Sequence, residues 1–361
     1  MHMIGFIIAA IIQVFSDKYG RKMGMGVFLF GAGSMFLLNG LFASKSYVLF
    51  GIIQMMLVAF ANGSCLAFTV YGIEIIGPKY RSTAGVLAHC YFALGFMLLT
   101  PIAMIVDNVA SFMFIGVIIS LVALAVLPFV PPSFRWQLAA GGRTDEGVAT
   151  LAKFTKKCGA SLDVDTVTSL AIKQDEVKSA VKQDIRDLVK SPVMMRLSAK
   201  LSFLWVVTSL SYYKLAIGEK SGNLMIDNIW SGVTEVVFLV LGSFCIQLRW
   251  AHRRWLLCGL FLITACSLAM NCVLETFNQP EPAQLACLPG RGASVVLFAV
   301  IFVYTAEIYP TTVRSSGLGF CSFWGRIGGV FAPQVDRLAL FGVWVPGSAV
   351  TVLLIAACLT S

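Results

Sequence analysis

Apolar residues come in long continuous blocks along the chain, and polar residues collect in the short segments between them. Most blocks are about 20 residues long, the length that an α-helix needs to cross about 30 Å of hydrocarbon. Strands of a membrane barrel instead alternate apolar and polar residues over about ten positions. The pattern therefore predicts eleven membrane-crossing helices, near residues 3–15, 24–42, 47–70, 84–106, 111–130, 197–217, 228–248, 255–274, 292–308, 316–335 and 340–358.

The first block could be mistaken for a secretory signal peptide. No basic stretch precedes it, and Asp17, Lys18 and Arg21 follow where a small-residue cleavage site belongs. We therefore interpret residues 3–15 as a membrane span.

Composition agrees with a membrane protein. The 361 residues are 58% hydrophobic and only 12% charged, whereas soluble domains average about 25% charged residues. The formal net charge is +9, which would suit a nucleic-acid partner if the basic residues were clustered on one domain.

The basic residues instead follow the loops. Most of them lie in segments that share one side of the membrane if the blocks alternate in direction: 16–23, 77–83, 131–196, 249–254 and 309–315. The opposite side carries Lys45, Lys214, Lys220, Arg291 and Arg337. Cytoplasmic loops are enriched in Lys and Arg, so we predict that the first set is cytoplasmic and expect no nucleic-acid partner.

A polar segment at 131–196 divides the blocks into two groups. Its apolar residues are too few to build a separate core, so we predict surface helices there. The sequence thus predicts an N-terminal transmembrane bundle at 1–130, a cytoplasmic loop at 131–196 and a C-terminal six-helix bundle at 197–361.

The two groups carry an internal repeat. Three pairs of residues lie at one common offset: Glu74 with Glu307, Arg81 with Arg314, and Arg21 with Arg254. Transporters are often built from two such halves, with the substrate site between them near the middle of the membrane. By this register the first half has five spans and the second has six, so we expect a complete protein to have one more span before this sequence.

Four motifs carry a family resemblance: Ser16 to Lys22, Glu74 to Gly85, Pro131 to Trp136, and Tyr304 to Arg314. Together they resemble the major facilitator superfamily and, within it, the organic cation, carnitine and organic anion transporters. The third motif departs from the family, since Pro132 stands where the family has an acidic residue.

The resemblance implies an all-α major facilitator fold made of two parallel-repeat helical bundles, with about 11 of 12 transmembrane helices present. It also implies a small organic ion as the substrate and a place in the plasma membrane.

Charged residues at the predicted cytoplasmic ends of the spans have a mechanical interpretation. We predict a cytoplasmic gate whose ion pairs close the inner side, formed by Asp17, Arg21, Glu74, Arg81, Arg254, Glu307 and Arg314. The alternative is that these are ordinary solvated loop charges.

Two ionisable residues, Glu235 and Arg326, fall near the middle of predicted spans. A charge at a helix centre costs about 2.5–3.5 kcal/mol on insertion scales, so each should face the protein interior. We predict that both line a water-filled cavity, where Glu235 binds a cationic group and Arg326 binds a carboxylate through its guanidinium. The alternative is that the two residues pair with each other.

The resemblance adds aromatic candidates. An arginine at position 326 is similar to carnitine and anion transporters, which implies a substrate with a carboxylate, such as carnitine. Residues that match cavity positions of the family are Tyr212, Tyr213, Phe298 and Phe302, with Tyr91 and Phe92 as further candidates. Aromatic faces attract organic cations, although packing against lipid or protein would explain any single one of them.

The sequence contains none of the common nucleotide-binding, zinc-protease, serine-hydrolase or dinucleotide motifs. We therefore predict a transporter rather than an enzyme, with no cofactor and no metal site. Cys272 and Cys287 flank a predicted external loop and could form a disulfide.

Three alternatives remain open at this point: a truncated, non-transporting fragment or regulatory isoform, a sugar porter, and a multi-span receptor. The internal repeat argues against a receptor.

Overall fold

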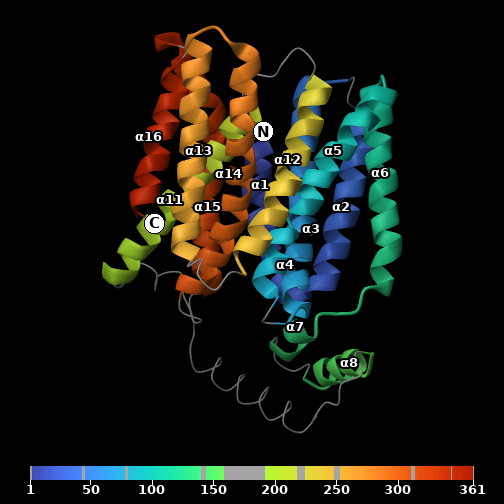
Figure 1. The fold of residues 1–361 in the computed structure, drawn as a ribbon. Helices are drawn as coiled ribbons and strands as arrows, with labels where there is room; N and C mark the ends of the chain where they lie inside the picture. Colours follow the sequence, from blue (N-terminus) through green and yellow to red (C-terminus); the bar gives the residue numbers. More distant parts are fainter. Residues whose placement is uncertain are drawn as a thin grey trace. The chain divides into compact units, whose positions relative to one another are not determined.

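The computed structural model describes residues 2–42, 45–77, 80–139, 144–157, 192–217, 224–247, 253–309, 314–342 and 344–360. All regular structure within these ranges is helical (Figure 1). The prediction of an all-α membrane protein is therefore confirmed. The chain divides into two compact units, one formed by Met1–Pro78 with Val106–Gln183 and the other by Lys79–Ile105 with Asp184–Ser361.

The first unit is built around one central helix. Its helices are α1 (His2–Tyr19), α2 (Arg21–Phe42), α3 (Tyr47–Ile75), α6 (Val109–Val126), η1 (Leu127–Phe129), α7 (Phe134–Ala139) and α8 (Thr144–Lys157). Helix α2 packs against α1, α3 and α6. Phe28 and Tyr71 are among the buried residues between them. Gly20 separates α1 from α2 with a φ of +110°, a backbone conformation that favours glycine.

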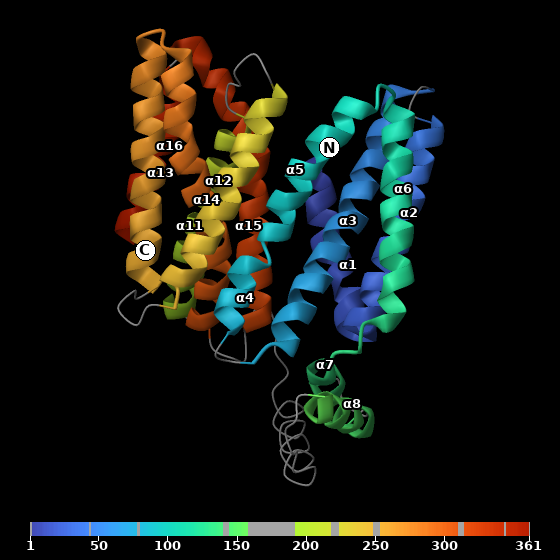
Figure 2. The ribbon, with the colours of Figure 1, turned by 45° about the vertical axis from the view of Figure 1, so that its right-hand side comes forward.

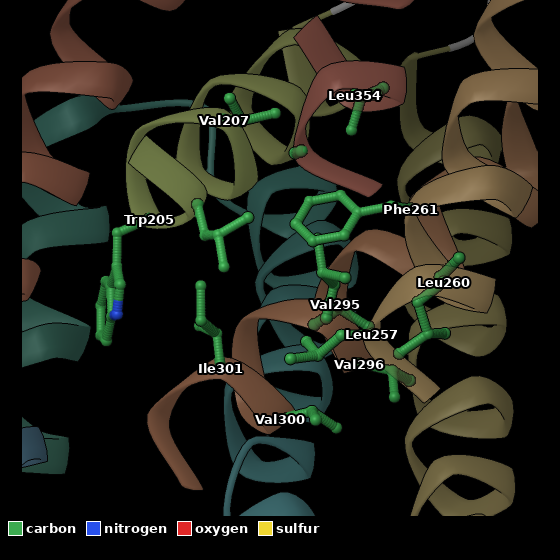
Figure 3. Close-up of a cluster of buried hydrophobic side chains, with 14 of the residues drawn as sticks. Trp205, Val207, Leu257, Leu260, Phe261, Val295, Val296, Val300, Ile301 and Leu354 are labelled. Carbon is green, nitrogen blue, oxygen red and sulfur yellow. The ribbon is translucent and has the colours of Figure 1, made fainter. Parts of the chain in front are cut away.

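The second unit holds the remaining helices, which Figure 2 shows from a second direction. They are α4 (Arg81–Leu87), α5 (Cys90–Ile105), α11 (Pro192–Ile217), α12 (Leu224–Cys245), α13 (Arg253–Thr276), α14 (Pro280–Ile308), α15 (Arg314–Val335), η2 (Asp336–Phe341) and α16 (Val345–Thr360). Helix α14 packs against α11, α12 and α13, while α11 also packs against α15 and α16. Figure 3 shows buried side chains from α11, α13, α14 and α16 meeting in one core.

The helices follow the predicted blocks. Among the described residues, eight helices are long and apolar enough to cross a membrane, and α16 is a shorter apolar helix. Two boundaries differ from the prediction. The fourth block is interrupted at residues 88–89, between α4 and α5. Helix α14 begins at Pro280 rather than near 292, so the placement of Arg291 in an external loop was wrong.

The division into units also differs from the predicted bundles at one place. Helices α4 and α5 fall within the predicted bundle 1–130 but group with the second unit. The reason is close packing of α5 on α12, where Met97 fills the space beside Gly232 so that no room is left for a methyl group. The surface helices predicted for the cytoplasmic loop include α7 and α8, and residues 158–191 lie outside the described part of the chain.

The cysteine pair suggested by the sequence does not form a disulfide. Cys272 and Cys287 both carry free thiols. Cys272 is buried, and its sulfur lies against Gly347 of α16. This cysteine therefore packs as a small apolar side chain, as buried cysteines commonly do.

Candidate functional site

A buried ion pair joins α12 to α14. The Arg291 Nε atom lies 3.0 Å from Glu235 Oε1, and the two side chains are only 8% and 1% exposed. The Arg291 guanidinium also lies over the ring of Phe96, 5.6 Å from its centre. Removing one partner from such a pair would leave a buried charge without compensation, which is strongly unfavourable. The two charges therefore hold each other in place.

Two glycines allow the pair to form. Gly292, the neighbour of Arg291, faces the ring of Phe238 on α12. Further along α12, Gly242 faces Val296 of α14. A Cβ added to Gly242 would lie 2.5 Å from the valine side chain. Small residues let helix backbones approach closely. The approach at these glycines brings the α14 guanidinium within reach of the α12 carboxylate.

The hydrogen-bond pattern of α14, which continues as one helix from Pro280 to Ile308, is modified directly before the arginine. Pro289 has no N–H, so one bond of the helical ladder is absent there. At the next position Ser267 of α13 inserts its hydroxyl, which donates to the Ala286 carbonyl and accepts from the Gly290 N–H at 3.0 Å. In a regular helix these two backbone groups would bond to each other. The Ser267 hydroxyl therefore bridges two backbone groups that form a single hydrogen bond in a regular helix.

Aromatic side chains of α11 and α14 form a continuous series of ring contacts. The ring centres are 5.3 Å apart for Tyr212 and Tyr213, 6.0 Å for Tyr212 and Phe298, and 5.9 Å for Phe298 and Phe302. Trp205 ends the series, edge-on to Phe302 at 4.5 Å. The structure thus brings together the four aromatic residues predicted for α11 and α14.

The aromatic series links two charged groups. Tyr212 lies within electrostatic range of both Glu235 and Arg291. Tyr213 accepts a hydrogen bond from Arg326 of α15, which is 9% exposed. The two neighbouring tyrosines therefore connect the ion pair at one end with a second buried guanidinium at the other.

The predicted pairing of the charged residues needs a correction. Glu235 does not pair with Arg326, the alternative left open by the sequence, but with Arg291. The residue that sequence reasoning missed carried a usable signal. Arg291, Phe298 and Phe302 are spaced by seven and four positions, which places them on one face of a helix.

The remaining aromatic candidates lie elsewhere. Tyr91 and Phe92 are 38% and 54% exposed and lie on α5. His89, in the turn between α4 and α5, instead approaches Phe302 at 6.2 Å between ring centres. Its Nδ1 atom lies 3.0 Å from the Gly85 carbonyl, which holds the imidazole in place.

In the first unit, two of the predicted gate residues meet. The Arg21 Nε atom lies 3.0 Å from Glu74 Oε1. The second oxygen of Glu74 accepts a hydrogen bond from Ser133, directly before α7. The pair therefore ties α2 and α3 to the start of segment 131–196, which was predicted to be cytoplasmic. The side chains of Asp17 and Arg81 lie outside the described part of the chain.

In the second unit, Glu307 pairs with the neighbour of the predicted gate residue Arg254. Glu307 forms its ion pair with Arg253, whose Nη2 atom also donates to Ser82 at 3.1 Å, while Arg254 is exposed. Successive residues of a helix point about 100° apart, so two neighbouring arginines do not face the same carboxylate. Arg254 is the residue at the repeat offset from Arg21, but Arg253 is the residue that pairs with Glu307. The side chain of Arg314 lies outside the described part of the chain.

Comparison with known families and proteins gives consistent results. The family described as "Sugar (and other) transporter" matches residues 1–359. The chain is 30% identical to the organic cation transporter protein of Drosophila melanogaster over 368 residues, which cover 96% of this chain and 64% of that protein. It is 26% identical to solute carrier family 22 member 6-A of Xenopus laevis, covering 96% of this chain and 62% of the relative.

Solved structures agree in fold. The proton:xylose symporter XylE superposes with a TM-score of 0.73 at 16% identity, covering 99% of this chain and 83% of the symporter. The human organic anion transporter MFSD10 gives a TM-score of 0.71 at 13% identity, covering 99% of this chain and 81% of the transporter. At such identities the likeness concerns the fold alone. The chain spans slightly under two thirds of the length of the first two relatives above.

Proposed function

We propose that this chain, which belongs to the sugar (and other) transporter family, is a secondary transporter of small organic ions. Its similarity to an organic cation transporter protein and to solute carrier family 22 member 6-A supports this. It works by alternating access, in which the two halves of the protein expose the substrate site to one side of the membrane at a time. We assign it to the plasma membrane and assign it no catalytic reaction.

One observation carries the choice of substrate class: buried charges of both signs lie near the two neighbouring tyrosines of the aromatic series. Glu235 and Arg326 come next to Tyr212 and Tyr213 respectively. Ionisable groups inside membrane helices are costly and usually serve a substrate or ion pathway. A zwitterion such as carnitine would place its ammonium group near Glu235 and its carboxylate near Arg326.

Arg326 is the proposed carboxylate site. A guanidinium has five N–H donors in a planar fork, so it can donate to Tyr213 and to a substrate carboxylate at the same time. Phe298 and Phe302 supply ring faces for a quaternary ammonium group or an apolar substrate body. Their packing in the series fixes these faces before the substrate arrives.

We assign the gate role to the ion pairs at the predicted cytoplasmic ends of the helices. Arg21 with Glu74 serves the first unit, and Arg253 with Glu307 serves the second. These pairs would form or break as the inner side closes or opens.

Uptake by cells expressing the chain tests the proposal. Radiolabelled carnitine and tetraethylammonium are offered to cells with the natural protein, with Arg326→Ala, and with Arg337→Ala as a control at an exposed arginine of η2. We expect carnitine uptake above background, a loss of about tenfold or more in Arg326→Ala, as for a charged hydrogen bond worth about 1.5–3 kcal/mol, and a smaller loss for tetraethylammonium.

Two outcomes would contradict this. Absence of uptake of both probes, with the protein detected at the cell surface, would exclude the transport function for these ions. An equal loss of both probes in Arg326→Ala would exclude direct carboxylate recognition by this arginine.

A further inference from the structure

We propose that Arg291 is a tethered counter-ion that occupies the cation-binding carboxylate of Glu235, and that the cationic group of a substrate displaces it. The displacement uses the modified hydrogen-bond pattern of α14 at Ser267. This deepens the proposed function, on which it rests, by naming the residue that sets the preference between plain cations and zwitterions.

The first step is that the carboxylate is already occupied. Arg291 Nε lies 3.0 Å from Glu235 Oε1, with both side chains almost fully buried. A substrate ammonium that approached this pair would meet the arginine charge as well as the carboxylate, and like charges at one buried site are unfavourable. An incoming cation therefore competes with Arg291 for Glu235.

The second step is that the displaced guanidinium has somewhere to go. Its Cζ atom lies 5.6 Å from the ring centre of Phe96 on α5. An aromatic face stabilises a cation, most strongly where water is excluded. Because the guanidinium already contacts this ring while it pairs with Glu235, displacement from the carboxylate leaves Arg291 with one partner rather than none.

The third step is that α14 is built to bend at this point. The residue directly after the modified hydrogen-bond pattern is Arg291 itself, following Pro289 and Gly290. A Cβ on Gly290 would lie 2.6 Å from the Ser267 hydroxyl, so glycine is what leaves room for the inserted side chain. Sharp bends in helices occur at proline and where a side chain enters the ladder. Both conditions are met here.

A second residue of α13 supports the same segment. Asn271, one turn beyond Ser267, donates through Nδ2 to the Ala283 carbonyl at 3.2 Å. Two side chains of one helix face thus bond to backbone groups of α14 on the N-terminal side of Arg291. They act as positioning residues, since they determine where the arginine starts without touching the substrate.

The consequence is selectivity. A plain cation must displace Arg291 with only its own attraction to Glu235. A zwitterion gains a second contact, because its carboxylate binds Arg326 while its ammonium takes the place of Arg291. The displaced Arg291 stays nearby and repels a plain cation, which carries a net positive charge, more than a zwitterion, whose carboxylate offsets its ammonium. Arg291 therefore disfavours plain cations relative to zwitterions, which is discrimination through an unfavourable contact with the wrong substrate.

Binding measurements on the purified full chain in lipid nanodiscs at pH 8 test this inference. Arg291→Met keeps an unbranched side chain and removes the charge. By calorimetry, we expect the dissociation constant of tetraethylammonium to fall about tenfold or more, with a smaller change for carnitine. In the double variant Glu235→Gln with Arg291→Met, the gain should disappear. Tetraethylammonium binding no tighter in Arg291→Met than in the natural protein would overturn the inference.

Ser267→Ala gives a second test that keeps both charges. Without the serine hydroxyl, the Gly290 N–H can bond directly to the Ala286 carbonyl and stiffen α14. We expect tetraethylammonium to bind several-fold more weakly, because a stiffer α14 bends less often and the bent state is the one that binds the cation. Ser243→Ala is the matched control, since this buried serine of α12 donates to the Val240 carbonyl within its own helix. If Arg291→Met does not fold, unchanged or tighter binding in Ser267→Ala overturns the inference.

Uptake of tetraethylammonium in the same variants separates the two proposals. Tighter binding without uptake in any variant would leave the counter-ion inference standing and remove the transport function. Uptake of tetraethylammonium without tighter binding in Arg291→Met would support the transport function and remove the counter-ion inference.

Discussion

Trp205 fixes the contact between α11 and α14. Its side chain is 1% exposed, and its indole Nε1 donates to the Thr305 hydroxyl at 2.9 Å. The same ring lies edge-on to Phe302 at 4.5 Å and contacts Phe298 at 6.0 Å. A single buried hydrogen bond thus sets the direction of a ring against which the aromatic series packs.

Thr305→Val removes the acceptor of that bond and keeps the shape of the side chain. The indole N–H would be left buried without a partner, which costs about 1–3 kcal/mol. We expect a lower melting temperature in lipid nanodiscs and a smaller effect in Thr264→Val, whose buried hydroxyl bonds only to Leu260 of its own helix. In Trp205→Phe with Thr305→Val the loss should be less than additive. Equal melting temperatures for Thr305→Val and the natural protein would show that the bond does not stabilise the fold.

The residues of the site differ in how well a sequence reveals them. Glu235 and Arg326 stand out because a charge inside an apolar block has no other explanation than a place in the protein interior. Arg291 stands beside Pro289 and Gly290, residues that mark loops in water. Its spacing to Phe298 and Phe302 is the signal that the sequence offers, whereas the hydrogen bonds of Ser267 to Ala286 and Gly290 beside it are visible only in the structure.

Among the elements, the start of α15 depends on one tyrosine. Tyr309, just after α14, is 1% exposed and donates to Ser198 of α11 at 2.9 Å. Burial raises the pKa of the Tyr309 phenol above its ordinary value, so the hydroxyl stays protonated at physiological pH. The ring fits because Gly317 of α15 has no side chain.

Gly317→Ala should disturb this fit. A Cβ would lie 2.7 Å from the Tyr309 ring, whereas a Cβ on Gly319, two positions later on α15, would meet nothing within 4 Å. We expect Gly317→Ala to destabilise the protein by about 1–3 kcal/mol through overpacking. Gly319→Ala should be neutral or slightly stabilising, since alanine favours helix. The melting temperatures of the two purified variants measure the difference, and equal values would show that α15 moves aside at no cost.

The elements themselves were largely predictable, and the exceptions have physical causes. A helix that crosses hydrocarbon must be long and apolar, so its block is visible without knowing its neighbours. The break at residues 88–89 and the early start of α14 at Pro280 carry no such signal. Both depend on packing: of α5 on α12, and of α13 on α14. The same holds for Arg253, whose choice over Arg254 depends on the direction of a helix rather than on the repeat.

At the scale of the whole molecule, the internal repeat reappears as two Arg–Glu ion pairs in different surroundings. The side chains of Arg21 and Glu74 are 13% and 18% exposed, whereas those of Arg253 and Glu307 are 26% and 47% exposed. Glu74 also accepts from Ser133. The attraction within the Arg21–Glu74 pair should therefore be stronger than that within the Arg253–Glu307 pair, because exposed pairs are screened by water and salt.

Substitution of each carboxylate by its amide tests this difference. Glu74→Gln should cost about 1–3 kcal/mol, as expected for a partly buried charged hydrogen bond. Glu307→Gln should cost less than about 1 kcal/mol, the usual range for exposed pairs. Melting temperatures at low and at high salt provide the measurement, and the salt dependence should be larger for the second pair. A greater loss in Glu307→Gln than in Glu74→Gln would contradict the assignment.

The distribution of basic residues predicts the orientation of the whole chain. The segment between α2 and α3 contains a single basic residue, Lys45, whereas α8 and its surroundings are rich in lysine. By the positive-inside rule, the first segment faces outward and α8 lies in the cytoplasm. An epitope tag inserted after Lys45 should bind antibody on intact cells, and a tag after Lys157 should bind only after permeabilisation. Both tags keep the charge pattern, so the reverse labelling would show that some feature other than loop charge determines the orientation. It would also place the Arg21–Glu74 and Arg253–Glu307 pairs on the outer side, where they could not act as a cytoplasmic gate.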